Sequence, residues 1–285
     1  MRAAQATVAA LCLTITVVGG CADQSALVGT TGTQTTYLRP FADNASQTPR
    51  WMDIADNLYR TAFRGSYQYP AATAQLQYTT QQAPLQFAVS APARALKPSF
   101  CYQMKLEGPS GEPWANSRTT NFENYQLGTN GRWWCDTCNA ALDDAAVLQS
   151  GAHLGHLVKG YLYFDFVVAG QSGAAQQTST VNSSYHVTWK ASQRARGSSD
   201  GPVRTVTVVA RKDGWAYDRT YRTTTVSLYG EREPGRPAPG TLALAPGLYE
   251  GVEFRLTEET FHATRPYGGN WRTVMVAPGL SFEVP

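Results

Sequence analysis

The sequence predicts an all-β protein: an antiparallel β-sandwich of jelly-roll-like type, built as one large or two packed sandwiches and preceded by one amphipathic helix. Two observations lead to this prediction. Short segments that alternate apolar and polar residues recur from about residue 80 to the C-terminus, with glycine and proline between them. Charged residues make up only 16% of the 285 residues, whereas about a quarter is usual in globular proteins. Thr, Ser, Gln, Gly and Tyr replace them, as suits a β-rich secreted protein.

The N-terminal twenty residues have the features of a secretory signal peptide. One arginine precedes an apolar run that is too short, and too interrupted by threonine, to span a bilayer. The run ends in VVGGC, which resembles the bacterial lipobox. That resemblance implies cleavage before Cys21, acylation of Cys21 (palmitate among the acyl groups) and anchoring in the cell envelope. Ala22 after the cysteine favours the outer membrane. The alternative is an ordinary signal peptide with a chance cysteine.

Two further elements are expected before the β-rich part. Residues 21–47 are rich in Thr, Gly and Ser without periodicity, and predict a lipid-anchored flexible tether. Residues 48–65 predict an amphipathic helix, because Thr48 can cap it, Pro49 suits its first turn and apolar residues recur at helical spacing. We expect this helix to pack on the domain that follows.

The β-rich part divides into residues 80–195 and 203–285, as two domains or two halves of one domain. In FCYQMKLE at 100–107, alternation places the four apolar side chains on one face. In GYLYFDFVVA at 160–169, it places Leu162, Phe164 and Phe166 on one side. LAPGLY at 244–249 resembles the corner motif of many extracellular sandwich domains, in which the tyrosine hydroxyl bonds back to the corner backbone; here that residue is Tyr249.

A wider resemblance covers roughly residues 80–285. The segments FCYQMKLEG, GRWW, GYLYFDF, SSYHVTW, LTEETFH and GGNW, in this order, resemble a family of secreted bacterial and archaeal proteins that is uncharacterised. The resemblance implies a common fold and export, and it implies no activity. The CDTC insertion after GRWW does not match that family.

No arrangement of residues predicts catalysis. The chain has no G-x-S-x-G elbow, no P-loop and no G-x-G-x-x-G. Glu259 and His262 could bind a metal or transfer protons, but the alternation before them predicts a strand, which would place them on opposite faces. Asp143 and Asp144 are better explained as loop or helix-cap residues.

The sharpest chemical signal is WWCDTCNAALDD at 133–144, followed by GAHLGHL at 151–157. Covalent haem is excluded because Asn139 follows the second cysteine. Three interpretations remain. The preferred one is a disulfide from Cys101 to one cysteine of the pair, since export favours oxidation. The second is a metal site of Cys135, Cys138, His153 and His156, close to the spacing of structural zinc. The third is a local bridge within C-x-x-C.

Two functions of different class follow. The first is a lipid-anchored envelope protein with a structural or binding role, whose partner is a protein or a glycan and which contacts the membrane through its lipid. The alternative is an envelope metal-binding protein that uses the Cys/His cluster for zinc or copper. No cofactor is expected apart from that structural zinc. Nucleic acid is excluded as a partner by export, and the net charge of +3 gives no global bias.

Overall fold

The structure is a computed structural model, and it describes residues 32–41, 52–64, 67–111, 122–149, 155–182, 186–188, 202–212, 215–221, 223–231, 242–258 and 272–285. The strands are β1 (Thr33–Tyr37), β2 (Arg39–Pro40), β3 (Gln75–Thr79), β4 (Gln86–Ala91), β5 (Cys101–Glu107), β6 (Arg132–Cys135), β7 (Ala140–Leu142), β8 (Val158–Val168), β9 (Ala175–Thr180), β10 (His186–Thr188), β11 (Arg204–Val208), β12 (Thr224–Glu231), β13 (Gly247–Glu258) and β14 (Arg272–Val284). The helical elements are α1 (Thr61–Arg64), α3 (Phe122–Asn130) and the π-helical turn η1 (Ala145–Gln149).

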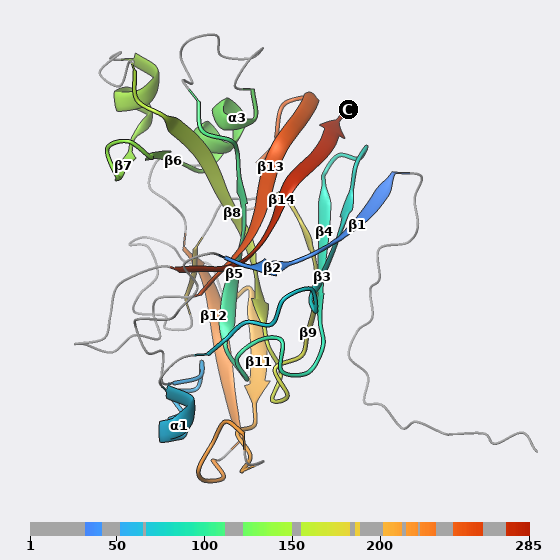
Figure 1. Ribbon diagram of the computed structural model, residues 1–285, viewed down its shortest axis with the longest axis vertical. Coiled ribbons are helices and arrows are strands. Elements are labelled where there is room, and N and C mark those ends of the chain that lie inside the picture. Colours follow the sequence, from blue (N-terminus) through green and yellow to red (C-terminus); the bar gives the residue numbers. More distant parts are fainter. Residues whose placement is uncertain are drawn as a thin grey trace, which may run out of the picture.

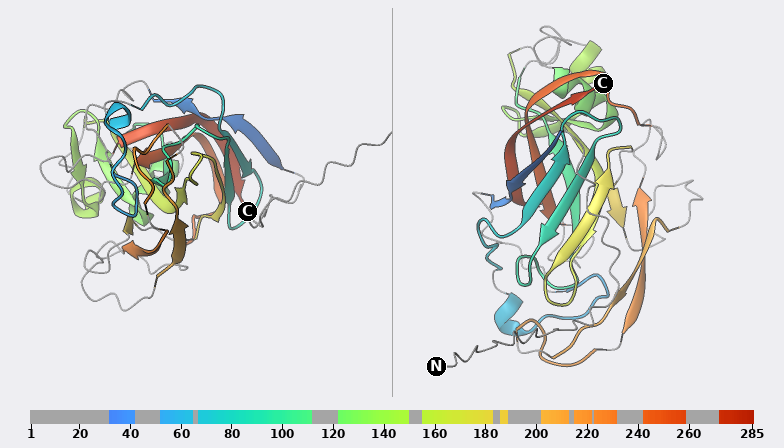
Figure 2. Two further views of the ribbon diagram at one scale, coloured as in Figure 1. Left: turned by 90° about the horizontal axis from the view of Figure 1, so that it is seen from below. Right: turned by 90° about the vertical axis from the view of Figure 1, so that its right-hand side faces the viewer.

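The predicted all-β class is confirmed, because antiparallel sheets pack face to face as a sandwich. One sheet has the order β1-β3-β4-β9 and the other has the order β2-β14-β13-β5-β8-β6-β7. The right-hand view of Figure 2 shows the four-stranded sheet in front of β13 and β14. In Figure 1, β6, β7 and α3 lie at one end of the molecule and α1 lies at the other.

Phe87 on β4 marks the centre of the core between these two sheets. It is fully buried, and its ring stacks on Phe254 and meets Phe164 and Phe282 of the opposite sheet. Aromatic contacts of this kind add to the free energy gained by burying apolar area. The four apolar residues of 100–107 all join this core, as alternation predicts.

A third layer covers part of the outer face of the seven-stranded sheet. The sheet β10-β12-β11 contributes Val208, Val226 and Leu228 to a second buried cluster, and these residues pack with Cys101 of β5 and Phe166 of β8. The outer face of β5 and β8 is therefore buried at this end of the sheet, where a single sandwich would leave it in water.

Phe166 contradicts the alternation expected in β8. Leu162 and Phe164 face the main core as predicted, whereas Phe166 lies in the second cluster. The cause is a β-bulge: Met104 pairs with Asp165, but the next residue, Lys105, pairs with Tyr163. One extra residue on β8 shifts the side-chain phase by one position.

The tether prediction is wrong for residues 33–40. β1 pairs with β3, and β2 pairs with Met275 and Val276 of β14. The two strands form one segment that bends at the buried Leu38 and passes from one sheet to the other (Figure 1). Threonine-rich sequence forms strands well at a sheet edge, whereas the Thr, Gly and Ser composition by itself predicts a flexible tether. Residues 21–31 and 42–47 lie outside the described residues.

The predicted helix over 48–65 is also wrong where the chain is described. Residues 52–60 form a turn in which Met52 bridges Leu58, and only Thr61–Arg64 is helical. The carboxylate of Asp53 accepts the backbone N–H groups of Ala55 (2.8 Å) and Asn57 (3.0 Å). An aspartate that takes up backbone donors in this way competes with the helix.

The two β-rich segments share one sheet. β13, from the segment 203–285, pairs along its length with β5, from the segment 80–195. Residues 189–201, which contain the expected boundary, lie outside the described residues. The segments are thus halves that contribute neighbouring strands to the same sheet.

The corner assigned to Tyr249 is confirmed. Its hydroxyl donates a hydrogen bond to the backbone carbonyl of Ala245, four residues earlier, at 3.0 Å. The ring is buried and stacks on Phe282. This bond fixes the direction in which the chain enters β13.

Candidate functional site

The cysteine pair lies in the turn of the β6–β7 hairpin. Cys135 ends β6 and pairs with Ala140, the first residue of β7. Asn139 adopts a left-handed conformation (φ 49°) that lets the chain turn back. Cys135 and Cys138 are joined by a disulfide, with Cα atoms 5.3 Å apart. Cys135 is buried and Cys138 is exposed.

The preferred disulfide from Cys101 is therefore wrong, and strand register explains why. Cys101 pairs with Val168 at one end of β8, whereas Cys135 pairs with Val158 at the other. Ten residue steps along a strand separate them by about 33 Å, but a disulfide needs Cα atoms within about 7 Å. Cys101 lies in the second buried cluster.

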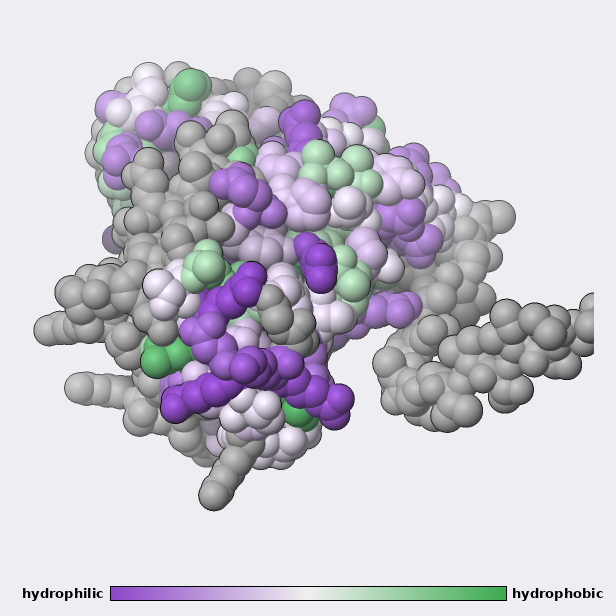
Figure 3. Space-filling view, turned by 60° about the horizontal axis from the view of Figure 1, so that its bottom comes forward, coloured by the Kyte–Doolittle hydropathy of each residue, from purple (hydrophilic) through white to green (hydrophobic). Residues whose placement is uncertain are grey.

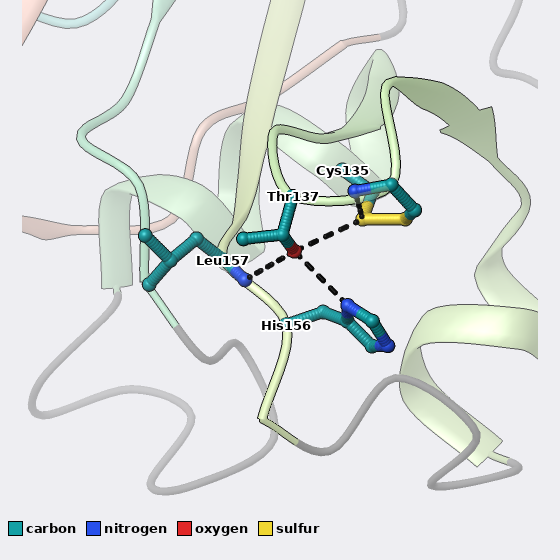
Figure 4. The surroundings of a disulfide bond; sticks show 5 residues. Cys135, Thr137, His156 and Leu157 are labelled. Atoms are coloured by element: carbon teal, nitrogen blue, oxygen red, sulfur yellow. Dashed lines mark hydrogen bonds between the residues drawn. A yellow bond between two sulfur atoms is a disulfide. The ribbon is translucent and has the colours of Figure 1, made fainter.

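His156 approaches the disulfide from the opposite side of the turn (Figure 4). The Thr137 side-chain oxygen lies 3.0 Å from His156 Nδ1 and 3.6 Å from Cys135 Sγ, and it accepts the backbone N–H of Leu157 at 3.2 Å. The backbone N–H of Cys138 points at Cys135 Sγ, 3.0 Å away. One threonine side chain thus links the sulfur to the imidazole.

Three of the four sequence-predicted metal ligands come together. Donor atoms of Cys135, Cys138 and His156 all lie within 4.8 Å of one another. His153 lies outside the described residues. The sequence spacing places these three residues with His153 in one candidate metal site.

The other candidate residues have structural roles or lie outside the described residues. Asp143 accepts the backbone N–H of Ala146 (2.7 Å) at the start of η1, and Asp144 accepts the indole N–H of Trp133 (2.8 Å). Both were predicted to be loop or cap residues. Glu259 and His262 are not among the described residues.

A polar groove of about 290 Å³ opens between β8, β9 and β11. Its centre is Asp165, which the bulge in β8 places beside β9. The Asp165 carboxylate accepts the Phe166 backbone N–H (2.7 Å), the Ser179 hydroxyl and the Gln177 amide (3.4 Å). Arg204 of β11 completes the group, with Nη2 3.5 Å from Asp165 Oδ1.

Arg204 is held in position from two further directions. Its Nη1 donates to the Phe166 carbonyl (3.1 Å), and its guanidinium lies 4.4 Å from the centre of the Phe166 ring. The side chain is still 30% exposed. Sequence reasoning missed this site; the available signal was Asp165 itself, a lone acid within the apolar run LYFDFVV.

Glu107 is a buried acid surrounded by three cations on the outer face of the seven-stranded sheet. Its carboxylate lies 2.6 Å from Lys105, 2.7 Å from Lys159 and 2.9 Å from Arg255. Lys105 also lies 4.2 Å from the centre of the Tyr161 ring. Burial by itself would raise the pKa of Glu107, but the three cations lower it to about 2.

A second buried ion pair joins Lys97 to Glu258 at 2.7 Å, and both side chains are almost completely buried. Tyr69 donates its hydroxyl to the same Glu258 oxygen at 2.6 Å. Tyr102 lies 3.2 Å from the Tyr69 hydroxyl and accepts the Lys97 backbone N–H at 2.8 Å. The network lies inside the main core, where each polar group depends on the others.

Hydrophilic residues gather over the end of the molecule seen in Figure 3. Arg211, Lys212 and Arg219 are exposed in the loops that join β11 to β12. Within the described ranges, no helix has the length and apolar character needed to cross a bilayer.

Comparison with known protein families, with curated proteins and with solved structures finds no match. The resemblance of residues 80–285 to a secreted family therefore stays a prediction. The fold and its two chemical sites, the Cys/His turn and the Asp165–Arg204 groove, carry the functional argument.

Proposed function

We propose that the protein is a lipid-anchored binding protein of the cell envelope, and that it binds a glycan in the groove at Asp165 and Arg204. The observation that carries the proposal is the groove's lining, in which a carboxylate and a guanidinium are fixed side by side among polar groups.

The groove has the chemistry that a sugar requires. Each sugar hydroxyl donates and accepts hydrogen bonds at once, so a site needs donors and acceptors close together. Asp165 supplies acceptor oxygens. Arg204 has five N–H donors, of which the contacts to Phe166 and Asp165 use two. A volume of about 290 Å³ is near the lower end of the range of small-molecule sites and fits about one sugar unit.

The groove is also preorganised. Asp165 is held by Ser179 and Gln177, and Arg204 is held by the carbonyl and ring of Phe166. Side chains that are already ordered lose little conformational entropy when a ligand binds. This favours recognition of a defined ligand over a general polar surface.

Replacing Arg204 with alanine is expected to weaken glycan binding at least tenfold. Hydrogen bonds from a charged group contribute about 1.5–3 kcal/mol each, and 1.4 kcal/mol corresponds to tenfold in affinity. Isothermal titration of the full chain against neutral envelope oligosaccharides measures the change.

Arg219→Ala is the matched control, because Arg219 also lies over an aromatic ring, that of Tyr221 at 4.5 Å, but outside the groove. If the two variants lost affinity equally, the glycan would not bind in the groove at Asp165 and Arg204. No binding of any oligosaccharide by the parent would exclude glycans as the ligand class.

The membrane part of the proposal rests on Cys21. We expect Cys21→Ala to move the protein from the detergent-extracted membrane fraction to the soluble fraction, because acyl chains contribute about 0.8 kcal/mol per buried methylene. Fractionation followed by immunoblotting measures it. A variant that stays with the membrane like the parent would contradict lipid anchoring and leave the groove proposal intact.

A further inference from the structure

We propose that reduction of the Cys135–Cys138 disulfide converts the β6–β7 turn into a binding site for a soft divalent metal ion such as Zn²⁺, with Cys135, Cys138 and His156 as ligands. The oxidised form is a covalent staple, and the reduced form is a metal site. The proposal is independent of glycan binding, which concerns a different set of residues.

The ligand geometry is nearly in place. The three donor atoms lie within 4.8 Å of one another. In a tetrahedral zinc site with bonds of about 2.3 Å to sulfur and 2.0 Å to nitrogen, the donor atoms are about 3.6–3.8 Å apart. Breaking the disulfide lets the two sulfur atoms separate to that distance, and the imidazole needs to move by only about an ångström. A fourth position is completed by water or by another donor.

The surrounding backbone suits a thiolate ligand. The N–H of Cys138 points at Cys135 Sγ from 3.0 Å, and such donors stabilise a metal-bound thiolate. The turn is held on both sides, because β6 pairs with β7 and also with β8. Trp133, next but one before Cys135, is fully buried and bonded to Asp144. The frame therefore does not depend on the disulfide alone.

A bound metal would take the place of the contact between Thr137 and His156. His156 Nδ1 faces the Thr137 side chain and the sulfur atoms in Figure 4. Metal binding would exchange the Thr137–His156 contact for a coordination bond. Zinc bound by two thiolates and an imidazole gains far more free energy than one hydrogen bond of this kind, so the reduced turn favours the metal.

The reduction step follows from the unequal exposure of the two cysteine residues. Cys138 is exposed and Cys135 is buried, so an external dithiol attacks Cys138 Sγ through its thiolate. Cys135 leaves as a thiolate that the Cys138 N–H stabilises. The second thiol of the reductant then displaces Cys138 and closes the reductant's own disulfide. The protein gains two electrons, and the metal binds two thiolates in place of two thiol protons.

Cobalt titration of the full chain tests the proposal. The chain is reduced with a phosphine, freed of reductant under argon and titrated with Co²⁺. We expect about one Co²⁺ per chain, with tetrahedral d–d bands and thiolate-to-cobalt charge transfer, and displacement of Co²⁺ by Zn²⁺. Oxidised chain should bind at least about 100-fold more weakly, because it lacks thiolates.

Variants locate the site. Cys138→Ser and His156→Ala should each lower affinity by on the order of 100-fold, and His186→Ala, a change on β10 in a different sheet, should leave it unchanged. Equal binding by oxidised and reduced chain, or parent-like affinity in both ligand variants, would overturn the proposal. If those variants fold poorly, alkylation of the reduced parent decides: Zn²⁺ should protect Cys138 from iodoacetamide, and unchanged labelling would also overturn it.

Discussion

Replacing Glu107 with glutamine is expected to destabilise the protein by about 3–5 kcal/mol, since removing one partner of a buried charge group leaves the others uncompensated. Three cations lie within 2.9 Å of this carboxylate. Lys159 also pairs with Asp136, and Arg255 also pairs with Glu253. The ion pair described for Lys105 is with Glu107 alone. Urea unfolding measures the change. Glu283→Gln, an exposed acid on β14, is the control and should shift stability by less than about 0.5 kcal/mol.

The same variant should alter the acid sensitivity of the fold. The pKa of Glu107 is lowered from 4.5 to about 2, so the folded state favours the charged form. That stabilisation is complete above pH 4.5 and is lost as the pH falls toward 2. The parent should therefore lose stability across this window, and Glu107→Gln should lose less. An unchanged urea midpoint and an unchanged acid profile would show that the cluster contributes nothing to stability.

Replacing Lys97 with methionine should also cost about 3–5 kcal/mol, because it leaves the Glu258 carboxylate charged in the main core. Glu258→Gln should be costly for the converse reason. The double variant, Lys97→Met with Glu258→Gln, removes both charges and keeps an acceptor for the Tyr69 hydroxyl. It should therefore be much less destabilised than the sum of the two single variants.

Urea unfolding of the four proteins in this cycle measures the coupling free energy between the two charges. We expect it to exceed 1 kcal/mol, as for residues in one buried network. Lys212→Met, a change at an exposed lysine, controls for loss of a positive charge. Additive effects of the two single changes would mean that the buried pair is not coupled.

Alternation of apolar residues predicted the β class correctly, because this pattern arises where one face of a sheet packs against a core. The residues of 100–107 that alternation placed together do lie together, and the corner at Tyr249 has its predicted hydrogen bond. These features are local. The first depends on the two-residue period of a strand, and the second joins two residues that are four apart in the sequence.

The helix prediction is wrong because its apolar residues pack into two different buried clusters. Ile54 is buried in the second cluster and Tyr59 in the main core, so the two residues serve different layers. The turn between them is fixed by the Asp53 carboxylate, which Tyr217 also contacts at 2.8 Å from a distant loop. Helical spacing cannot distinguish one shared face from two separate cores.

The sites were less predictable than the fold, because they depend on what lies beside a strand. Lys105 and Glu107 occupy the polar positions of an alternating strand, which normally face water, yet both are buried. The bulge that aims Asp165 at Arg204 leaves no mark in the sequence apart from the acid itself. Cys101 and Cys135 are near each other in the sequence, but they pair with opposite ends of β8.

The pairing of β2 with β14 bears on how the chain is made. Residues near position 40 find their partners near position 275, so the seven-stranded sheet is not complete until almost the whole chain has been made. Contacts between such distant segments form slowly. Until then β2 has no partner strand in this sheet, and its backbone polar groups stay unpaired within it.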